Sequence, residues 1–419
     1  MTDAYFDGSI RTQYLDPVSY VPNGRCAFEL DGDKMAYLSN MRLLDLGCVA
    51  GTAAAYNKGL GTLSLIKNIR LMDARTELSA LRNPAQYLFF KNANRSNAIN
   101  KSSDSFLKRN ALGYEISAIN NKIQHIYASG DAGVSEDVTV RGYLDLREVF
   151  PILNVLRVLP TAIFSNLRIE LEFESKQANQ VLDNVNSTIT TLRPVLALDH
   201  ITNSVLVNQE IESLMKSGIV WDEIEHDQYT VPAVDTALFA ADKRQVQSVS
   251  NSSLAYKGKI VERLLVCKQL QNKALETSGG TVQGFGGVAS SQSVLLQTIQ
   301  YRLNGKNVLP GFNGANRPNE RLAIVADEWG STTGFQGSNL YKWSNRADSL
   351  AVPQEAGQMD WDCVRIGARV ADLQINLQRT NQRDSDAKAA TNEALNINCY
   401  AEVKKALAVM AKGYNIVYA

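Results

Sequence analysis

Histidine is rare in this chain, and its three copies limit the reactions that the chain could catalyse. His125, His200 and His226 have no second histidine or cysteine within metal-ligand spacing. A serine or cysteine nucleophile needs a neighbouring base, which here must be one of these histidines or a lysine. The motifs GxSxG, HExxH and DxDxDG do not occur. These residues therefore predict no catalytic and no metal site.

Four carboxylates surround one of these histidines in the segment Trp221–Asp227 (WDEIEHD). Carboxylate oxygens suit hard divalent cations, so this segment has two interpretations. It is either a cation site built around His226 or an acidic surface loop, and we favour the loop.

A second group of carboxylates alternates with apolar residues. Glu170, Glu172 and Glu174 are separated by Leu171 and Phe173, so on a strand the three acids share one face. Such a row could resemble a glycosidase pair or a cation site. The simpler interpretation, which we favour, is a solvated strand face.

The glycine-rich segment Thr277–Gly287 resembles a phosphate-binding loop only superficially. Such a loop continues with Lys-Ser or Lys-Thr at a helix start, whereas Val288 and Ala289 follow here. A dinucleotide fingerprint would need a βαβ unit, which the surrounding sequence does not predict. We therefore expect a flexible loop and no bound cofactor.

Composition excludes further classes of protein. Basic and acidic residues number 43 each, so the net charge is zero and a general nucleic-acid binder is not expected, although a local basic patch stays open. No apolar run reaches 18 residues, and the start MTDAYFDGSI predicts no secretory signal. The cysteines form no CxxC pair, so we expect reduced, mostly buried thiols: Cys26, Cys48, Cys267, Cys363 and Cys399.

The elements that must position these side chains are mostly strands. Strict alternation predicts a strand at Leu167–Phe173, and similar patterns recur at Leu373–Leu377, Leu395–Cys399 and Tyr414–Tyr418. Few helices are expected. Asp145 is a candidate N-cap with Glu148 at the third helical position, and Pro151 limits that helix to about a turn. Helical spacing also marks Phe106–Ile126, while Val403–Met410 fits a helix or a strand.

The middle of the chain predicts a boundary. Lys176–Leu192 is rich in Asn, Gln, Ser and Thr, and Arg193-Pro194 follows. We place one domain at 1–192 and the other at 193–419, with Val195–Leu198 opening the second. Leu65–Leu71 weakly echoes Leu295–Tyr301, which suggests two similar modules. A hairpin is expected after the second segment, at Asn304-Gly305.

One stretch resembles a known family. Gly142–Leu153 (GYLDLREVFPIL), Val158–Thr161 (VLPT) and the strand at Leu167–Phe173 are similar to double jelly-roll major capsid proteins, closest to those of virophages and polinton-like viruses. Weaker likenesses to strands of that fold lie at Met35–Gly47, Arg193–Asp199, Tyr301–Pro310 and Tyr400–Val417. The resemblance implies an all-β chain of two consecutive antiparallel eight-stranded jelly rolls, with long loops and a few short helices. It also favours strands for the tail.

The same resemblance implies a structural role rather than an enzyme. Three copies would form a pseudo-hexagonal capsomer, and capsomers would tile an icosahedral shell around double-stranded DNA, often over an internal membrane. The expected partners are other copies of the chain together with penton and minor capsid proteins, in the virion. No catalytic, cofactor-binding or metal-binding residue is expected, and no sequence-specific nucleic-acid binding.

Long connections separate the predicted strands, and one contains several aromatic residues. Trp329, Phe335, Tyr341 and Trp343 lie in Gly311–Ala351. They suit a trimer contact or an outward-facing tower, or a loop packed on its own subunit. Two other functions stay open. A viral spike or lectin-like β-sandwich would use these aromatics for glycans, and a carbohydrate-active enzyme would need two carboxylates facing each other across a groove.

Overall fold

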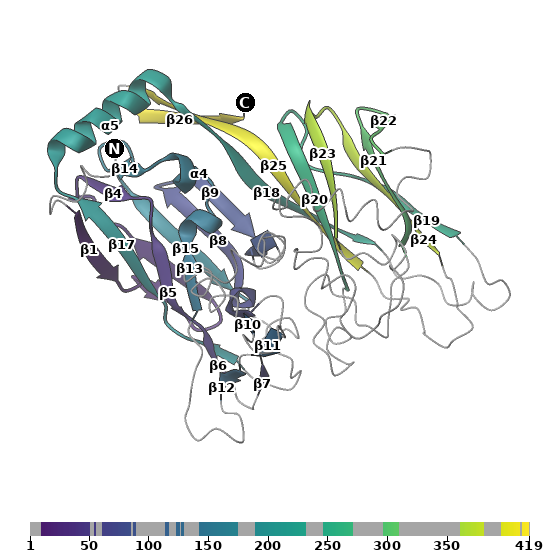
Figure 1. Cartoon of the computed structure of the whole chain (residues 1–419), viewed down its shortest axis with the longest axis horizontal. Coiled ribbons are helices and arrows are strands. Elements are labelled where there is room, and N and C mark those ends of the chain that lie inside the picture. Colours follow the sequence, from purple (N-terminus) through teal and green to yellow (C-terminus); the bar gives the residue numbers. More distant parts are fainter. Residues whose placement is uncertain are drawn as a thin grey trace.

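The computed structural model is built from β-sandwiches, as the sequence predicted (Figure 1). Two sandwiches lie side by side, one from each half of the chain. The residues that the structure describes are 10–50, 54–55, 61–84, 87–88, 114–116, 123–125, 127–129, 142–174, 189–231, 246–270, 296–309, 361–380, 395–410 and 413–418. The glycine-rich segment Thr277–Gly287 and the aromatic residues Trp329 to Trp343 lie outside these ranges, so both predictions stay untested.

The first sandwich pairs a six-stranded sheet with a five-stranded sheet. The six-stranded sheet comprises β1 (Ile10–Leu15), β4 (Ala36–Leu38), β5 (Arg42–Leu46), β13 (Gly142–Asp145), β14 (Val158–Pro160) and β17 (Val195–Ile201). The five-stranded sheet has the order β2 (Ser19–Tyr20), β3 (Arg25–Glu29), β15 (Leu167–Phe173), β8 (Ile66–Asp73) and β9 (Thr76–Arg82). Short pairs join β6 (Cys48–Ala50) to β16 (Ile189–Thr191), β7 (Ala54–Ala55) to β12 (Tyr127–Ser129) and β10 (Tyr114–Ile116) to β11 (Ile123–His125).

Strand β17 extends the first sandwich beyond the expected boundary. It pairs with β1, β4 and β5, so Val195–Leu198 does not open the second half, and that prediction was wrong. The polar run Lys176–Leu192 resembles a linker between domains. The chain nevertheless returns after Arg193-Pro194 to the same sheet, as β17. We therefore propose that the domains divide near Thr202–Gly218 rather than between residues 192 and 193.

The second sandwich repeats the arrangement with fewer strands. Its five-stranded sheet comprises β18 (Ile219–Val231), β25 (Leu395–Met410), β20 (Ile260–Leu270), β23 (Trp361–Arg369) and β26 (Gly413–Tyr418), the last of which pairs with β25. Its four-stranded sheet has the order β19 (Val246–Ser253), β24 (Leu373–Thr380), β21 (Leu296–Leu303) and β22 (Lys306–Asn307). The tail is therefore two strands, as the resemblance favoured.

The weak internal echo corresponds to a repeated topology. The order β3-β15-β8-β9 in the first sandwich matches β19-β24-β21-β22 in the second, so β8 and β21 occupy equivalent places. Both strands end in a tight turn with positive φ, at Ala74 after β8 and at Asn304-Gly305 after β21. The predicted hairpin at Asn304-Gly305 is therefore confirmed.

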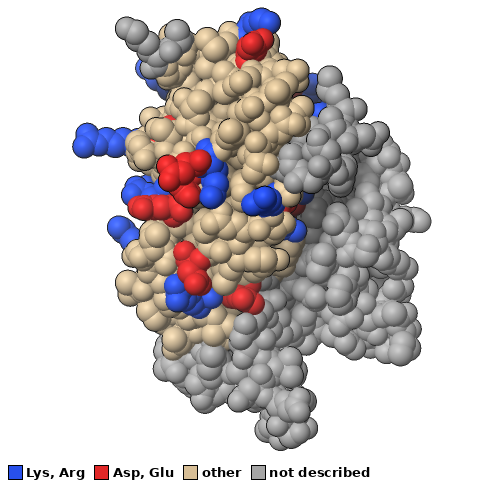
Figure 2. All heavy atoms as spheres, turned by 90° about the vertical axis from the view of Figure 1, so that its left-hand side faces the viewer, with Lys and Arg blue, Asp and Glu red and all other residues tan. Residues whose placement is uncertain are grey.

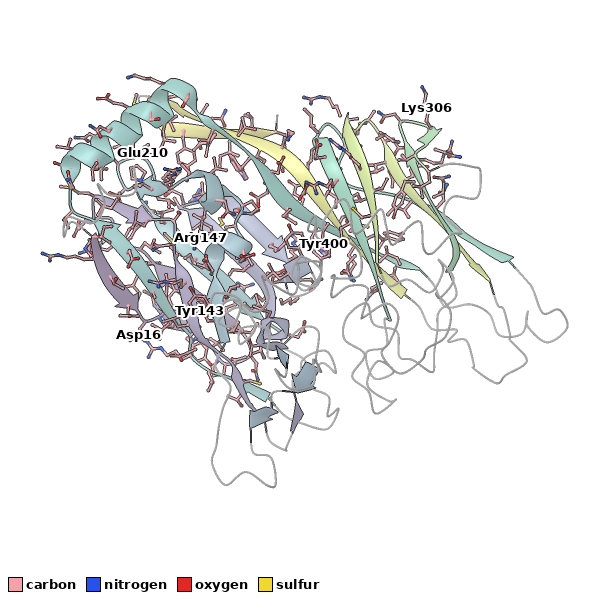
Figure 3. All side chains as sticks on the ribbon, in the orientation of Figure 1. Asp16, Tyr143, Arg147, Glu210, Lys306 and Tyr400 are labelled. Atoms are coloured by element: carbon pink, nitrogen blue, oxygen red, sulfur yellow. The ribbon has the colours of Figure 1, made fainter. Side chains whose placement is uncertain are left out.

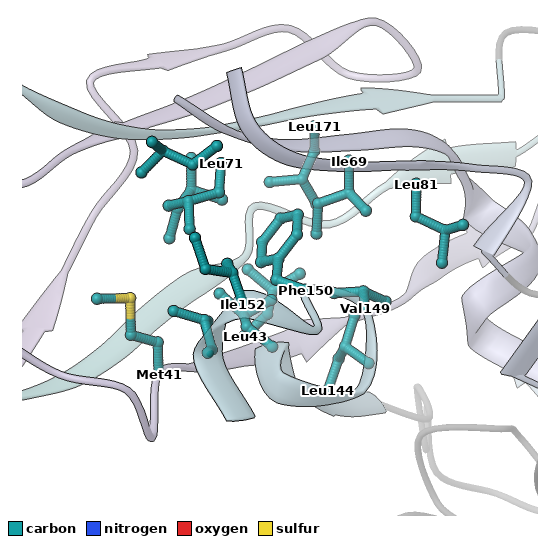
Figure 4. Close-up of a cluster of buried hydrophobic side chains, with 14 of the residues drawn as sticks. Met41, Leu43, Ile69, Leu71, Leu81, Leu144, Val149, Phe150, Ile152 and Leu171 are labelled. Carbon is teal, nitrogen blue, oxygen red and sulfur yellow. The ribbon is translucent and has the colours of Figure 1, made fainter. Parts of the chain in front are cut away.

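Alternation of burial explains why β15 is a strand. Leu167, Ile169, Leu171 and Phe173 are buried, whereas the residues between them are half-buried. The apolar face of β15 belongs to the same core as Gly142–Leu153, the segment that carries the family resemblance and that we call the capping segment. Figure 4 shows Phe150 and Ile152 of that segment between side chains of the two sheets, among them Leu43, Ile69 and Leu171.

The helices are few, and one of them was not predicted. Asp145 caps the 3₁₀ turn η3 (Leu146–Glu148) by accepting a hydrogen bond from the Arg147 amide, and α4 (Ile152–Val155) follows Pro151. A further 3₁₀ turn, η2, spans Gly61–Leu65. The helix expected across Phe106–Ile126 is contradicted where the segment is described, because β10 and β11 lie there.

Helix α5 (Ser204–Ser217) is the longest helix of the described residues, and the sequence analysis missed it. The features that favour a helix here are an N-cap, two buried apolar residues and a terminal glycine. The Asn203 side chain caps the helix by accepting from the Val205 and Leu206 amides, and Val207 and Leu214 are its buried residues. Gly218 ends it at φ 60°. In Figure 1 this helix lies above the first sandwich, at the start of the path into the second.

Candidate functional site at the junction of the two sandwiches

The junction between the sandwiches is the part of the described structure in which polar residues from distant segments converge. Strand β18 contacts β9 and α4, and α5 contacts β25. The core of the first sandwich continues across this boundary without a break. Residues of the second half that belong to the same apolar cluster are Trp221, Ile224, Leu265, Cys363, Tyr400, Leu407 and Val409. The two sandwiches are thus joined by an apolar, packed interface.

A buried carboxylate lies at the centre of this junction. Glu223 is 1% exposed and accepts hydrogen bonds from Ser79 Oγ at 2.6 Å and from Trp221 Nε1 at 2.7 Å. The Ala80 amide is a further donor. Ser79 and Ala80 belong to β9, so the carboxylate of one sandwich is held by donors from the other. Burial raises the pKa of Glu223 to about 7, against the opposing effects of Lys405 and of the donors.

Tyr400 reaches across the same boundary, where Figure 3 places its label between the two halves. Its hydroxyl donates to the Asn83 carbonyl at 3.0 Å, and its ring lies 5.8 Å from that of Tyr87. The His226 ring lies 4.9 Å from the Tyr400 ring, and its Nε2 donates to Asn398 Oδ1 at 3.0 Å. Burial lowers the pKa of His226, which favours the neutral imidazole.

The C-terminal strand is fastened to the first sandwich by a second carboxylate. Tyr414 donates to Asp73 Oδ2 at 2.8 Å, and its ring lies 5.1 Å from that of Phe164. Burial, with the neighbouring Asp73 carboxylate, raises the pKa of Tyr414, so this phenol stays protonated. Strand β26 therefore spans both halves, because it pairs with β25 and contacts β8.

An ionic group lies at the other end of β26. Glu225 accepts from Lys259 and from the Tyr418 hydroxyl, the latter at 2.8 Å, and Lys405 lies 3.6 Å from the same carboxylate. Lys259 also lies 4.6 Å from the centroid of the Tyr418 ring, which suits a cation–π contact. Charges here are paired within the chain.

The structure distributes the acids of Trp221–Asp227 over separate partners instead of collecting them. They lie on strand β18 and not in a surface loop, so the preferred interpretation was wrong. Asp222 pairs with Lys404 at 2.9 Å, and Asp227 accepts from the Ala255 amide. Among the described residues, no group of three or more His, Cys, Asp or Glu side chains could hold a metal ion.

The acids of β15 also occupy a structural position. Arg70 and Arg168 approach Glu170 to 2.5 and 2.7 Å, and Lys67 lies 3.0 Å from Glu172. Hydrogen bonds from Lys67 and Asn68 lower the pKa of Glu172. This is a row of ion pairs on a half-exposed face and does not form a pair of acids across a groove.

The remaining candidate residues are dispersed. His200 is on β17, and burial lowers its pKa. His125 ends β11. Cys26, Cys48, Cys363 and Cys399 are buried, as expected, and Cys267 lies on β20. Sequence reasoning missed the junction residues Ser79, Tyr400 and Tyr414, because only proximity in space distinguishes them from other polar strand residues. It singled out Glu223 only as one of the acids of Trp221–Asp227.

The face of the molecule shown in Figure 2 carries positive and negative side chains side by side. Figure 2 shows one side of the first sandwich, where Lys and Arg lie interspersed with Asp and Glu among uncharged residues. The described part of this face therefore offers no extended basic patch of the kind that a nucleic acid requires. No described helix combines the length and apolarity that crossing a membrane requires.

Comparison with known proteins supports the architecture. A chain in the cryo-EM structure of the Sputnik virophage is 10% identical, with a TM-score of 0.60, over 98% of this chain and 88% of that chain. The Faustovirus major capsid protein is 8% identical, with a TM-score of 0.57 over 96% and 90%. The mavirus major capsid protein is 10% identical, with a TM-score of 0.52 over 97% and 90%.

The sequence itself matches no family model and no curated protein significantly. At identities near 10%, structural likeness is evidence for the fold alone. The likeness covers at least 96% of this chain and 88% of each compared chain, so it includes both sandwiches and their junction. The chain has the double jelly-roll fold that these viral capsid proteins share.

Proposed function

We propose that this chain is a major capsid protein, a structural subunit that assembles with copies of itself into a virus shell. The observation that carries the proposal is the likeness to viral capsid proteins over at least 96% of the chain. A subunit of this kind must hold two sandwiches in one fixed relation, since each takes a different place in the lattice. The apolar cluster that continues across the junction supplies that rigidity.

The finer form of the proposal is a homotrimer. Three chains, each with two sandwiches, would form a pseudo-hexagonal capsomer, and capsomers would tile an icosahedral shell around double-stranded DNA. Penton proteins, minor capsid proteins and an internal membrane are the further partners of such a shell, and the virion is its place. Balanced surface charge supports dense tiling, because subunits at high local concentration repel one another weakly.

The test is the mass of the purified chain in solution, with negative-stain images of the same sample. One chain weighs 46.1 kDa, so a trimer has a mass of about 138 kDa. We expect that species, with hexagonal outlines. A chain that stays monomeric at high concentration would overturn the proposal and favour the spike or lectin-like binding module. Glycan binding that Trp329→Ala or Trp343→Ala abolishes would then identify that module.

A further inference from the structure

Among the junction contacts, one polar group differs from the rest in its surroundings. The Glu223 side chain is almost fully excluded from water and lies on β18, where Trp221, Ile224 and apolar side chains of the first sandwich surround it. The junction carboxylate Glu225, by contrast, has a cation, Lys259, at hydrogen-bond distance. Glu223 has instead three neutral donors, two of them from β9.

We propose that Glu223 is a proton-controlled contact between the two sandwiches, which holds β18 against β9 more firmly when its carboxyl is protonated. The inference concerns the single chain and does not depend on the proposed capsid role. It predicts that the junction loosens as the pH rises from acidic to neutral.

The donor geometry suits the protonated carboxyl. Trp221 Nε1 lies 2.7 Å from Oε2, whereas the Ser79 hydroxyl lies 2.6 Å from Oε1. A protonated carboxyl can donate from Oε1 to the Ser79 hydroxyl, which accepts as readily as it donates. The neutral acid then keeps hydrogen-bonded contact with Ser79 and Trp221 without placing a charge in the apolar junction. Ionisation places a negative charge there, and three neutral donors only partly replace its hydration.

The surrounding charges do not neutralise this carboxylate. Lys405 of β25 is the cation that acts on it, but the Lys405 ammonium is already directed to Glu225, at 3.6 Å. Helix α4 packs on β18 with no ionisable side chain. Two phenols feel the Glu223 charge, those of Tyr87 and of Tyr418 on β26. The charged groups that act on these phenols, and not on Glu223 itself, are Glu77 of β9, Glu148 of η3, Arg263 of β20, Glu402 of β25 and Glu225 of β18. The raised pKa of Glu223, about 7, is consistent with this balance.

The direction of the pH effect follows from proton linkage. The pKa of Glu223 is about 7 in the closed junction and 4.5 for a carboxyl exposed to water. Between these pH values the closed junction therefore binds more protons than the open one. The junction is therefore most stable at low pH and weakens as the pH rises toward 7. From pH 5 to pH 8, the equilibrium constant for opening should rise by about one to two orders of magnitude.

The first test reads the Trp221 indole, whose N–H touches the carboxyl. The chain has four tryptophans, so its indole signals are resolvable in a ¹⁵N NMR spectrum of the full chain, and Trp221→Phe identifies the relevant one. We expect its shift to titrate with a midpoint near pH 7 and to stop titrating in Glu223→Gln. A midpoint below pH 5.5 would overturn the proposal. A neutral midpoint that persists in Glu223→Gln would do so as well, and would point to His226.

The second test measures opening of the junction by hydrogen–deuterium exchange of β9 and β18 at pH 5 and pH 8, corrected for intrinsic exchange. The wild-type chain should show a rise in opening of about one to two orders of magnitude, and Glu223→Gln should show none. Asp222→Asn is the matched control on the same strand, since that carboxylate is half-exposed and paired with Lys404. It should keep the wild-type pH dependence. Equal pH dependence in wild type and Glu223→Gln would contradict the proposal. If Glu223→Gln does not fold, the midpoint of the Trp221 indole titration in the wild-type chain still tests it.

Discussion

The phenol of Tyr414 donates a hydrogen bond of 2.8 Å to the Asp73 carboxylate, although 341 positions separate the two residues in the chain. The other oxygen of the same carboxylate accepts from the Asn166 amide at 2.8 Å. Asp73 is 7% exposed. One buried side chain thus connects the end of β8, the segment before β15 and the C-terminal strand β26. It is a point at which the second half of the chain is fixed to the first.

Asp73→Ala should therefore destabilise the chain by about 2–3 kcal/mol, because it removes two hydrogen bonds to a charged acceptor. Tyr414→Phe removes one of these bonds and should cost about 1–2 kcal/mol. Urea unfolding of both single variants and of the double variant gives the coupling energy. We expect at least about 1 kcal/mol of coupling, since the residues are in direct contact.

Tyr14→Phe is the control for this pair, because its side chain is 67% exposed and the substitution should change the free energy of unfolding by under about 0.5 kcal/mol. Strictly additive effects of Asp73→Ala and Tyr414→Phe would mean that the two side chains do not interact in solution.

Gly218 is required where α5 gives way to β18. Its φ is +60°, and a Cβ there would lie 2.7 Å from the Leu407 carbonyl oxygen of β25. Gly218→Ala must therefore either strain the backbone or push β25 away, and we expect a loss of at least about 2 kcal/mol. Gly258 has φ +84° with no atom within 4 Å of a built Cβ, so Gly258→Ala isolates the backbone cost, about 1 kcal/mol. Thermal unfolding of the two variants compares them, and equal losses would argue against a close approach at Gly218.

Phe150 fills the core that the capping segment forms between the two sheets. It is fully buried among Leu43, Ile69 and Leu171 (Figure 4). Phe150→Ala should destabilise the chain by about 3–5 kcal/mol, through lost burial and the cavity that remains. Val155 lies nearby at the end of α4 but is 43% exposed, so Val155→Ala should cost under about 1 kcal/mol. Denaturant unfolding should separate the two clearly, and similar losses would mean that the cavity collapses.

Local pattern was enough to predict a β-rich chain and its clearest strand, whereas the double jelly roll and the strands of the tail were expected from the family resemblance. The alternation at Leu167–Phe173 is set by burial of every second residue, which is a property of the strand itself. The cap at Asp145 is equally local, because its side chain bonds an amide two positions later. The likeness of Gly142–Leu153 to capsid proteins also reflects local needs, since this segment must turn and fill the core at once.

The junction could not be predicted in this way. Ser79 and Glu223 lie 144 positions apart, and neither differs in type from residues that face solvent elsewhere. The segment around Glu223 drew attention as a row of acids, and the expected loop or cation site followed from composition alone. Whether a carboxylate meets a cation, water or a neutral donor depends on how two sandwiches pack. The expected domain boundary was wrong for the same reason. Strand β17 belongs to the first sandwich because it pairs with β1, β4 and β5, and these pairings cannot be read from local sequence.

Glu172 should show a pH dependence opposite to that of Glu223. Lys67 Nζ and Asn68 Nδ2 donate to its carboxylate at 3.0 and 2.6 Å and lower its pKa. A carboxyl with a lowered folded-state pKa stabilises the fold above its ordinary value of 4.5, and this contribution is lost as the pH falls. Because the side chain is 35% exposed, solvent screening limits the contribution at pH 7 to under about 1 kcal/mol.

Urea unfolding of wild type and Glu172→Gln at pH 7 and at pH 3 measures that contribution. We expect the variant to be less stable at pH 7, and its difference from the wild type to shrink at pH 3, because the carboxyl becomes neutral as the pH falls through its lowered pKa. Glu212→Gln on α5 is the control, since its carboxylate is 70% exposed and 3.9 Å from Lys216, and its effect should stay near zero at both values. A difference for Glu172→Gln that grows at low pH would mean that the contacts with Lys67 and Asn68 do not stabilise the charged form.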